Sequence, residues 1–329
     1  MQALDLVHHC GCGVSGGVAI LKGVGTQRNH TSDVDDEQRS APFATVVGLG
    51  DSSVRLLEAS GNREAQQAPV LNLLKLDSAC TSVTTNQDST VVVTSLRGQV
   101  WEVTLNKSEP YRWRLNGSAT SSCMVDTDIV VGLEAGKLTR IRSLYNEPIW
   151  ESASATSVNG LALCERSIVA AGQYGMSVYD LRTAVKSLST ISAVGFTSIA
   201  SSLNNGMYIA TGNYGGYVDL WDIRSLSSSK PLVSQQRHRG WTSSLAFNPS
   251  QNGSLEIFSA GNDGNLVCCD MNESCDEERV QIGPLASLAI TEASQEVFII
   301  AAQADGQVRY FTKPARGELS LAAPRTAYQ

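Results

Sequence analysis

The stretch that most constrains the fold is Tyr208–Arg224, which predicts a β-hairpin. It opens with the apolar run Tyr208–Ala210, whose residues favour strands. Asn213–Gly216 are turn formers, and Gly215 and Gly216 tolerate a positive φ at little cost. Apolar residues then resume an extended pattern after the turn. Because so tight a turn joins antiparallel neighbours, we expect two adjacent strands here.

The same hairpin skeleton occurs six more times along the chain. The other hairpins are Val46–Glu58, Val91–Thr104, Ile129–Ile141, Ile168–Arg182, Phe258–Asp270 and Val297–Phe311. The seven turns are centred near residues 52, 98, 136, 175, 216, 264 and 306, which lie 38 to 48 residues apart. A repeat of about 40–45 residues built on strand pairs is typical of a propeller blade. The spacing therefore predicts an all-β fold, a single seven-bladed β-propeller over residues 1–329.

A blade needs four strands, which we name a to d from the central channel to the rim. The hairpins supply strands b and c, and segments between the hairpins are candidates for strand a. These candidates are Val18–Leu21, Cys80–Thr84, Ser122–Val125, Asn159–Leu163, Thr197–Ser201, Trp241–Phe247 and Ser287–Ile290. Most begin with small polar residues and continue with aliphatic ones, which suits a narrow channel lined by small side chains.

This assignment leaves the last blade without its outer strand. Leu4–Val7 and Glu318–Ala322 are the two candidates that could pair there and remove the free sheet edge. Residues 25–42 form a polar stretch with an acidic run at 33–37, which predicts a solvated surface loop or a partner-binding segment. Residues 313–329 are expected to form a C-terminal tail beyond the last hairpin.

The composition is that of a globular chain, with 42% hydrophobic and 17% charged residues. A net charge of −7 argues against a non-specific nucleic-acid binder, which needs a basic face. No run approaches the roughly 18–20 apolar residues of a membrane span, and the first residues lack the pattern of a secretory signal. Most of the eight cysteines fall within expected strands, which favours buried thiols in a reducing compartment over a secreted protein.

Little in the sequence indicates chemistry. His8–Cys12 is the only cluster of metal-ligand residue types, and it lacks the second, spaced pair of a structural zinc site. The four histidines, at positions 8, 9, 30 and 238, have no acid–base partner motif. No nucleophile elbow, phosphate-binding loop or dinucleotide fingerprint is present. We therefore expect no catalytic site, no metal and no cofactor.

The sharpest motifs lie at 179–182, 221–224 and 238–270, and through them and its periodicity the chain resembles the WD-repeat β-propeller family over about residues 43–312. In that family, a Trp in strand c, a Ser or Thr in strand b, an Asp in the b–c turn and a His before strand a form a hydrogen-bonded staple. The resemblance implies that the staple residues here are Thr211, Trp221, Asp222, His238, Ser259 and Asp263.

No blade carries a complete staple. In the fifth blade Asn213 and Tyr214 replace the Asp, and in the sixth Cys269 stands where the Trp would be. We therefore expect stability to come mainly from ring closure and from packing between blades.

The order of motifs from 168 to 270 is similar to that of a narrower family, the 43-kDa WD-repeat nucleoporins of the Y-shaped outer-ring complex. A degenerate Tyr-Asp-Leu-Arg blade precedes a Trp-Asp-Ile-Arg blade, and His238, Trp241 and Asp263 follow in that order. The resemblance implies a structural subunit of the nuclear pore at the nuclear envelope. It also implies docking on an α-solenoid nucleoporin, as a monomer within a hetero-oligomer.

We therefore expect a non-catalytic protein-interaction scaffold. The b–c turns and the d–a loops share one face of the ring, called the top face, and loops on a rigid scaffold commonly carry recognition. Aromatic and arginine side chains dominate interface energetics. The candidate anchors on this face are Tyr174, Tyr214, Arg237, Arg239 and Trp241.

Two other functions stay open. WD-repeat substrate receptors of cullin-type ubiquitin ligases use Trp-Asp-x-Arg endings, and Arg182 and Arg224 end two such motifs in tandem, although arginines there could also serve packing between blades. A receptor for peptides or targeting signals, such as peroxisomal import cargo, has the same fold. Either alternative would place the protein in the cytoplasm or nucleoplasm.

Overall fold

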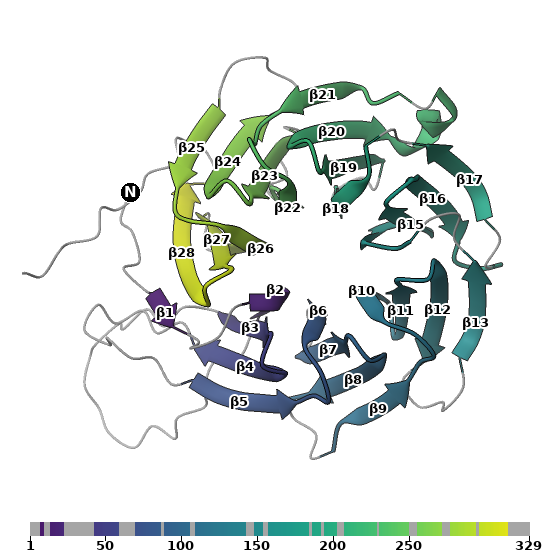
Figure 1. Cartoon of the computed structure of the whole chain (residues 1–329), viewed down its shortest axis with the longest axis vertical. Helices are drawn as coiled ribbons and strands as arrows, with labels where there is room; N and C mark the ends of the chain where they lie inside the picture. Colours follow the sequence, from purple (N-terminus) through teal and green to yellow (C-terminus); the bar gives the residue numbers. More distant parts are fainter. Residues whose placement is uncertain are drawn as a thin grey trace, which may run out of the picture.

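The computed structural model describes residues 7–9, 14–22, 43–58, 70–86, 89–105, 109–142, 148–153, 157–183, 186–191, 194–202, 207–228, 230–249, 255–271, 277–293 and 296–314. These residues form seven four-stranded antiparallel sheets, arranged as blades around a central axis (Figure 1). The predicted all-β, seven-bladed propeller is therefore confirmed. Within the described ranges, no helix is both long and apolar enough to cross a membrane.

Blades 1 to 6 each use four consecutive strands, ordered from the axis outwards. Blade 1 has β2 (Val14–Lys22), β3 (Phe43–Leu49), β4 (Ser53–Glu58) and β5 (Val70–Lys75); blade 2 has β6 (Cys80–Thr85), β7 (Thr90–Ser95), β8 (Gln99–Thr104) and β9 (Tyr111–Arg114); blade 3 has β10 (Ala119–Val125), β11 (Asp128–Leu133), β12 (Lys137–Arg142) and β13 (Pro148–Ala153). Blade 4 has β14 (Gly160–Cys164), β15 (Ser167–Gly172), β16 (Gly175–Asp180) and β17 (Lys186–Ile191); blade 5 has β18 (Phe196–Ser201), β19 (Tyr208–Asn213), β20 (Tyr217–Asp222) and β21 (Val233–Gln236), with the 3₁₀ helix η1 (Ile223–Ser228) after β20. Blade 6 has β22 (Thr242–Phe247), β23 (Glu256–Gly261), β24 (Asn265–Asp270) and β25 (Glu277–Gln281); blade 7 has β26 (Leu285–Ala293), β27 (Glu296–Gln303), β28 (Gln307–Pro314) and, outermost, β1 (Val7–His9).

The ring is closed by the N-terminal strand. β1 pairs antiparallel with β28, with His8 opposite Val308, so the outer edge of the last blade is covered. β1 overlaps the N-terminal candidate Leu4–Val7 only at Val7. The rest of that candidate, the competing Glu318–Ala322 and the whole 25–42 loop lie outside the described residues. The tail expected from residue 313 starts later, because β28 continues to Pro314.

The hydrophobic core lies between the blades rather than within each of them. Each sheet is sandwiched between two neighbours, so its b strand is buried on both faces and reads as a continuous apolar run. Every residue of β7 and of β11 is buried. At the closure, Val47 and Leu49 of blade 1 pack with Ile300 and Tyr310 of blade 7 in one cluster. This packing joins the first blade to the last.

Serine hydroxyls connect the inner strands of neighbouring blades. A β-bulge near the start of β6, β10, β22 and β26 precedes the serines concerned. Each hydroxyl accepts a backbone N–H from the next blade: Ser82 from Ser122 (3.2 Å), Ser121 from Leu161 (3.1 Å), Ser244 from Leu288 (3.1 Å) and Ser287 from Val18 (3.2 Å). These bonds satisfy backbone groups that have no sheet partner. The last one joins blade 7 to blade 1.

Candidate functional site

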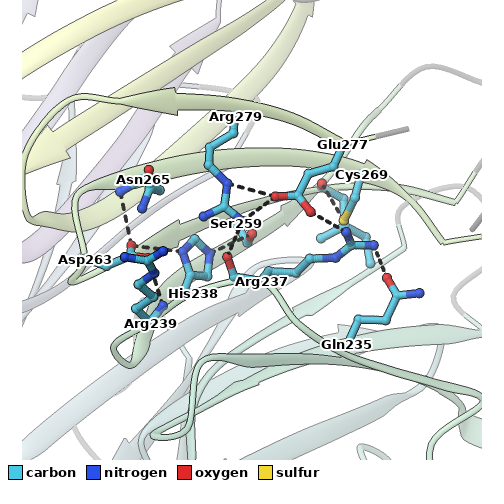
Figure 2. A network of polar contacts seen from close by, with 11 residues as sticks. Gln235, Arg237, His238, Arg239, Ser259, Asp263, Asn265, Cys269, Glu277 and Arg279 are labelled. Atoms are coloured by element: carbon cyan, nitrogen blue, oxygen red, sulfur yellow. Dashed lines mark hydrogen bonds and ion pairs between the residues drawn. The ribbon is translucent and has the colours of Figure 1, made fainter. Parts of the chain in front are cut away.

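His238, in the loop between β21 and β22, is the centre of a polar staple in blade 6. Its Nε2 lies 2.9 Å from Ser259 Oγ on β23, and its Nδ1 lies 3.1 Å from Asp263 Oδ1 in the β23–β24 turn (Figure 2). The same carboxylate accepts hydrogen bonds from the backbone N–H groups of Arg239 (2.9 Å) and Asn265 (3.1 Å). The staple therefore fixes the loop that leads to the top face.

The protonation state of His238 follows from its surroundings. Burial lowers the pKa of the imidazole, and this effect exceeds the opposing influence of the Asp263 carboxylate. The neutral ring donates Nδ1–H to Asp263 and accepts the Ser259 hydroxyl at Nε2. For Asp263, burial would raise the pKa, but hydrogen bonds to the carboxylate outweigh it and the pKa is lowered. Both ring nitrogens are thus used in structure, and the His238 side chain has no exposed surface to offer a substrate.

Blade 5 carries a different half of the staple. Trp221 Nε1 donates to Thr211 Oγ1 at 2.8 Å, and the indole packs edge-on against Phe196 with centroids 6.0 Å apart. Asn213 takes the place of the turn carboxylate, because its Oδ1 accepts the N–H groups of Gly215 (2.9 Å) and Tyr217 (3.1 Å). The amide thus holds the turn without a charge.

Asp222 is the one predicted staple residue that lies outside both staples. Its carboxylate accepts the backbone N–H of Arg224 at 2.9 Å and is paired with the Arg224 guanidinium. Because Asp222 ends strand c, it points to the face opposite the b–c turns. The prediction for this residue was therefore wrong.

The strand register shows what replaces the family tryptophan in the other blades. Trp221 stands opposite Ile209, and Cys269 stands opposite Ile257 in the same position of blade 6. In the remaining blades, the equivalent residues are Leu57, Val103, Ile141, Tyr179 and Phe311. Most are apolar and all are buried or half-buried. Packing between blades therefore takes over from the hydrogen-bonded staple along most of the ring.

The top face of blades 4 to 6 is continuous. The loop at Gly195 packs against Gln173 in the b–c turn of blade 4, since a Cβ at Gly195 would lie 2.7 Å from the Gln173 carbonyl oxygen. Tyr214 N donates to Gly195 O at 3.3 Å, which adds the b–c turn of blade 5. A Cβ at Gly216 would lie 2.2 Å from the carbonyl oxygen of His238, which adds the next loop. Turns and loops thus contact one another in series.

Large apolar side chains are exposed along this series. Tyr174 is 61% exposed, Tyr214 55% and Trp241 46%. Val194 and Tyr217 are also exposed, and neither was among the sequence candidates. We call these five residues, four aromatic side chains and Val194, the aromatic strip. The tertiary structure places them on one series of contacting turns and loops, and in the sequence Val194 and Tyr214 adjoin Gly195 and Gly215.

The two arginines predicted on this face behave differently. Arg239 is exposed. Arg237 is not an exposed anchor, because its side chain is only 11% exposed and its Nη1 lies 2.6 Å from Glu277 Oε2 on β25. The ion pair with Glu277 holds the Arg237 guanidinium against the protein, so the prediction of an exposed anchor at Arg237 was wrong. Glu277 and Arg279 were not among the residues predicted from the sequence. The only sequence signal for them is their two-residue spacing, which places both side chains on the same face of a strand.

Arg182 and Arg224 lie on the opposite face, at the c-strand ends of blades 4 and 5. Each guanidinium binds the carboxylate two residues earlier, Asp180 or Asp222, and each backbone N–H caps the same carboxylate. The hydrogen bonds from Arg182 lower the pKa of Asp180 to about 2. The two arginines are exposed in the same geometry, and the structure does not bring them to the aromatic strip.

Within the ranges given above, no three His, Cys, Asp or Glu side chains are grouped so that they could hold a metal ion. Part of the His8–Cys12 cluster, from Cys10 to Cys12, lies outside the described residues.

The blades and their top face define a seven-bladed β-propeller. The chain is similar to the crystal structure of the WD40 β-propeller domain of Doa1, with a TM-score of 0.73. The two are 14% identical, and the similarity covers 94% of this chain and 96% of that one. No family model matches the chain, and no curated protein matches it. At this level of identity, the likeness establishes the fold, and function has to be argued from the surface.

Proposed function

We propose that this protein is a non-catalytic scaffold that binds a protein partner through the aromatic strip on the top face of blades 4 to 6. The observation that carries the proposal is the exposure of Tyr174, Tyr214 and Trp241 along one continuous series of packed turns and loops. Tyrosine and tryptophan bring large contact areas with few rotatable bonds, and they anchor many protein interfaces. A ring closed by packing and hydrogen bonds holds them in fixed positions.

A non-catalytic role is consistent with the buried polar groups. The one histidine in the described top-face loops is committed to Ser259 and Asp263. The buried thiols have raised pKa values, for example about 12 at Cys80 and Cys164, because burial disfavours the thiolate. Neither type of group is therefore arranged as a general base or a nucleophile.

We further propose that the scaffold is a subunit of the nuclear pore outer ring, located at the nuclear envelope and docked on an α-solenoid nucleoporin. The order of motifs from 168 to 270 supports this assignment, and the aromatic strip lies within the same segment. A helical solenoid offers an extended binding surface, and tyrosine and tryptophan combine an apolar ring with a polar group that can hydrogen-bond at such an interface.

A ligase-receptor function has one specific observation in its favour. Arg182 and Arg224 are exposed in the same geometry on neighbouring blades, as tandem contacts to an adaptor would require. Each arginine already pairs with its own Asp, which also explains its presence without an adaptor. No comparable observation favours a receptor for peptide signals.

The test is affinity purification of the tagged chain followed by mass spectrometry, with imaging of the same chain in cells. We expect solenoid nucleoporins and staining of the nuclear rim, and we expect Tyr214→Ala with Trp241→Ala to lose these partners. Arg182→Glu with Arg224→Glu is the matched control and should keep them. Loss of partners only in the arginine variant would instead support the ligase function, and unchanged partners in the aromatic variant would refute the docking surface.

A further inference from the structure

Three arginine residues line a shallow hollow at the top of the boundary between blades 5 and 6. The hollow is lined by Gln236, Arg237, His238, Arg239 and Arg279. Two of the arginines come from the loop that follows β21, and the third lies on β25, the outer strand of blade 6 (Figure 2). The hollow therefore combines residues 40 positions apart that only the adjacency of the blades brings together.

The three positive charges exceed the negative charge placed against them. Glu277 pairs with both Arg237 (2.6 Å) and Arg279 (2.9 Å from Nε), and Arg279 also donates to the carbonyl of Arg237 at 2.9 Å. Burial would raise the pKa of Glu277, but its hydrogen bonds from the two arginines outweigh burial and lower it. One carboxylate is thus shared between two guanidiniums, in a chain whose overall charge is −7.

The other nearby carboxylates reduce the positive charge at the hollow but do not cancel it. Asp263 is nearly buried and already accepts hydrogen bonds from His238 and from two backbone N–H groups. Glu278, the neighbour of Glu277 on β25, lies 4.0 Å from Lys313 on the other side of the sheet. The three arginines are thus set against the carboxylates of Glu277 and Asp263, which leaves an excess of one positive charge at the hollow.

Two of the arginines that line the hollow have hydrogen-bond donors without an acceptor in the described structure. Arg237 Nε is buried and has no hydrogen-bond partner, although the other end of the guanidinium binds Glu277 and Gln235. The Arg239 side chain is exposed, and its contact with Asp263 is made by the backbone N–H alone. A buried donor without an acceptor is costly, and the exposed guanidinium of Arg239 is the group placed to donate to an anion in the hollow.

We propose that this hollow binds the phosphate group of a phosphorylated serine or threonine on the protein that docks on the top face. A phosphate monoester carries a charge of about −2 near pH 7 and three acceptor oxygens, and guanidinium groups bind it in a bidentate manner. The hollow adjoins Trp241 of the aromatic strip through Arg239 and Gly240 in the chain. The inference rests on the proposed docking function. It adds that phosphorylation of the partner strengthens the binding of that partner to the top face.

The direct test uses the purified full chain and O-phosphoserine as the probe, with serine and inorganic phosphate as parallel probes at constant ionic strength. Amide chemical shifts in an NMR titration report the site, and we expect movement at residues 236–240 with O-phosphoserine and inorganic phosphate but none with serine. Arg239→Ala removes a side chain that has no role in the described contacts, so it should leave the fold intact and weaken binding at least five-fold. Arg182→Ala, an exposed arginine on the opposite face, should leave binding unchanged.

The outcomes separate the possible ligands. Equal affinities of the wild type and Arg239→Ala, or equal responses to O-phosphoserine and serine, would overturn the proposal. Displacement of the probe by a single-stranded oligonucleotide at lower concentration would assign the site to nucleic acid instead and would also overturn it.

The partner-capture experiment tells this inference apart from the docking function. If Arg239→Ala and phosphatase treatment leave partner capture unchanged while Tyr214→Ala with Trp241→Ala abolishes it, the docking function stands and the phosphate site falls. If phosphate binds but the aromatic variant keeps its partners, the docking surface is wrong while the anion site remains.

Discussion

His238 Nε2 lies 2.9 Å from Ser259 Oγ, and this bond ties the loop between blades 5 and 6 to the second strand of blade 6. The loop continues through Arg239 and Gly240 to Trp241. A contact buried inside one blade therefore determines how an exposed aromatic is presented on the top face.

Ser259→Ala should lower the free energy of unfolding by about 1–3 kcal/mol, because it leaves His238 Nε2 buried without a donor. Chemical denaturation followed by tryptophan fluorescence measures the change. A double variant with His238→Ala should cost less than the sum of the two single variants, since the residues share one interaction. Strictly additive costs would show that the two side chains do not act together.

Stability should depend on pH through His238. Burial lowers the pKa of this imidazole in the folded state below its usual value of 6.5, so the unfolded chain takes up the proton first. The free energy of unfolding should therefore fall as the pH decreases below about 6.5, by at most about 1.4 kcal/mol per pH unit, until His238 is protonated in the folded state. Above that pH its contribution should be constant.

Denaturation curves between pH 7.5 and 5 provide the measurement, with His238→Gln as the comparison. The variant should show a shallower decline over the same range. The lowered pKa values of Asp263 and Glu277 act at more acidic pH, where stability is lost as these carboxylates are protonated. An identical slope in wild type and variant would contradict the prediction.

Two glycines in equivalent turns should respond differently to alanine. Gly216 and Gly264 both have a positive φ, of 78° and 85°, so alanine should cost about 1–2 kcal/mol at either position from backbone strain alone. At Gly216 the added Cβ would also lie 2.2 Å from the carbonyl oxygen of His238, whereas at Gly264 the nearest atom is 3.2 Å away. Gly216→Ala should therefore be the more destabilising by about 1–3 kcal/mol.

Thermal and chemical denaturation of the two variants measure this difference. Gly264→Ala acts as the internal control for strain in the turn. Equal losses of stability would mean that the blade 5 turn does not pack against the loop that carries His238. The top face of blades 5 and 6 would then not be continuous.

Closure of the ring can be tested with two matched serines. Ser287 Oγ accepts the N–H of Val18 across the boundary between the last and first blades, and Ser244 Oγ accepts that of Leu288 inside the ring. Alanine at either position should cost about 0.5–1.5 kcal/mol, the net value of one hydrogen bond. A loss at Ser244 with none at Ser287 would indicate an open ring.

Much of the architecture could be predicted from local sequence. Apolar runs on both sides of a glycine turn favour hairpins, and Val91–Thr104 and Phe258–Asp270 form them. The recurrence of such hairpins at nearly constant spacing defines the blades. The staple at His238 followed from the resemblance to the WD-repeat pattern. Asp222 was misassigned because a motif places a residue in the sequence but does not say which way the end of a strand points.

The sequence by itself determined that the chain is a ring of repeated sheets, because strand and turn propensities act over a few residues and recur seven times. Only the tertiary structure decided which surfaces the ring creates. Val7–His9 pairs with β28, more than 290 residues away in the chain, and Arg237, in the loop before blade 6, meets Glu277 on the outer strand of that blade. Such contacts depend on how strands distant in the chain are assembled, and no short stretch of sequence encodes them. The aromatic strip and the arginine hollow both arise in this way, from loops that are neighbours in space because the blades that carry them pack face to face.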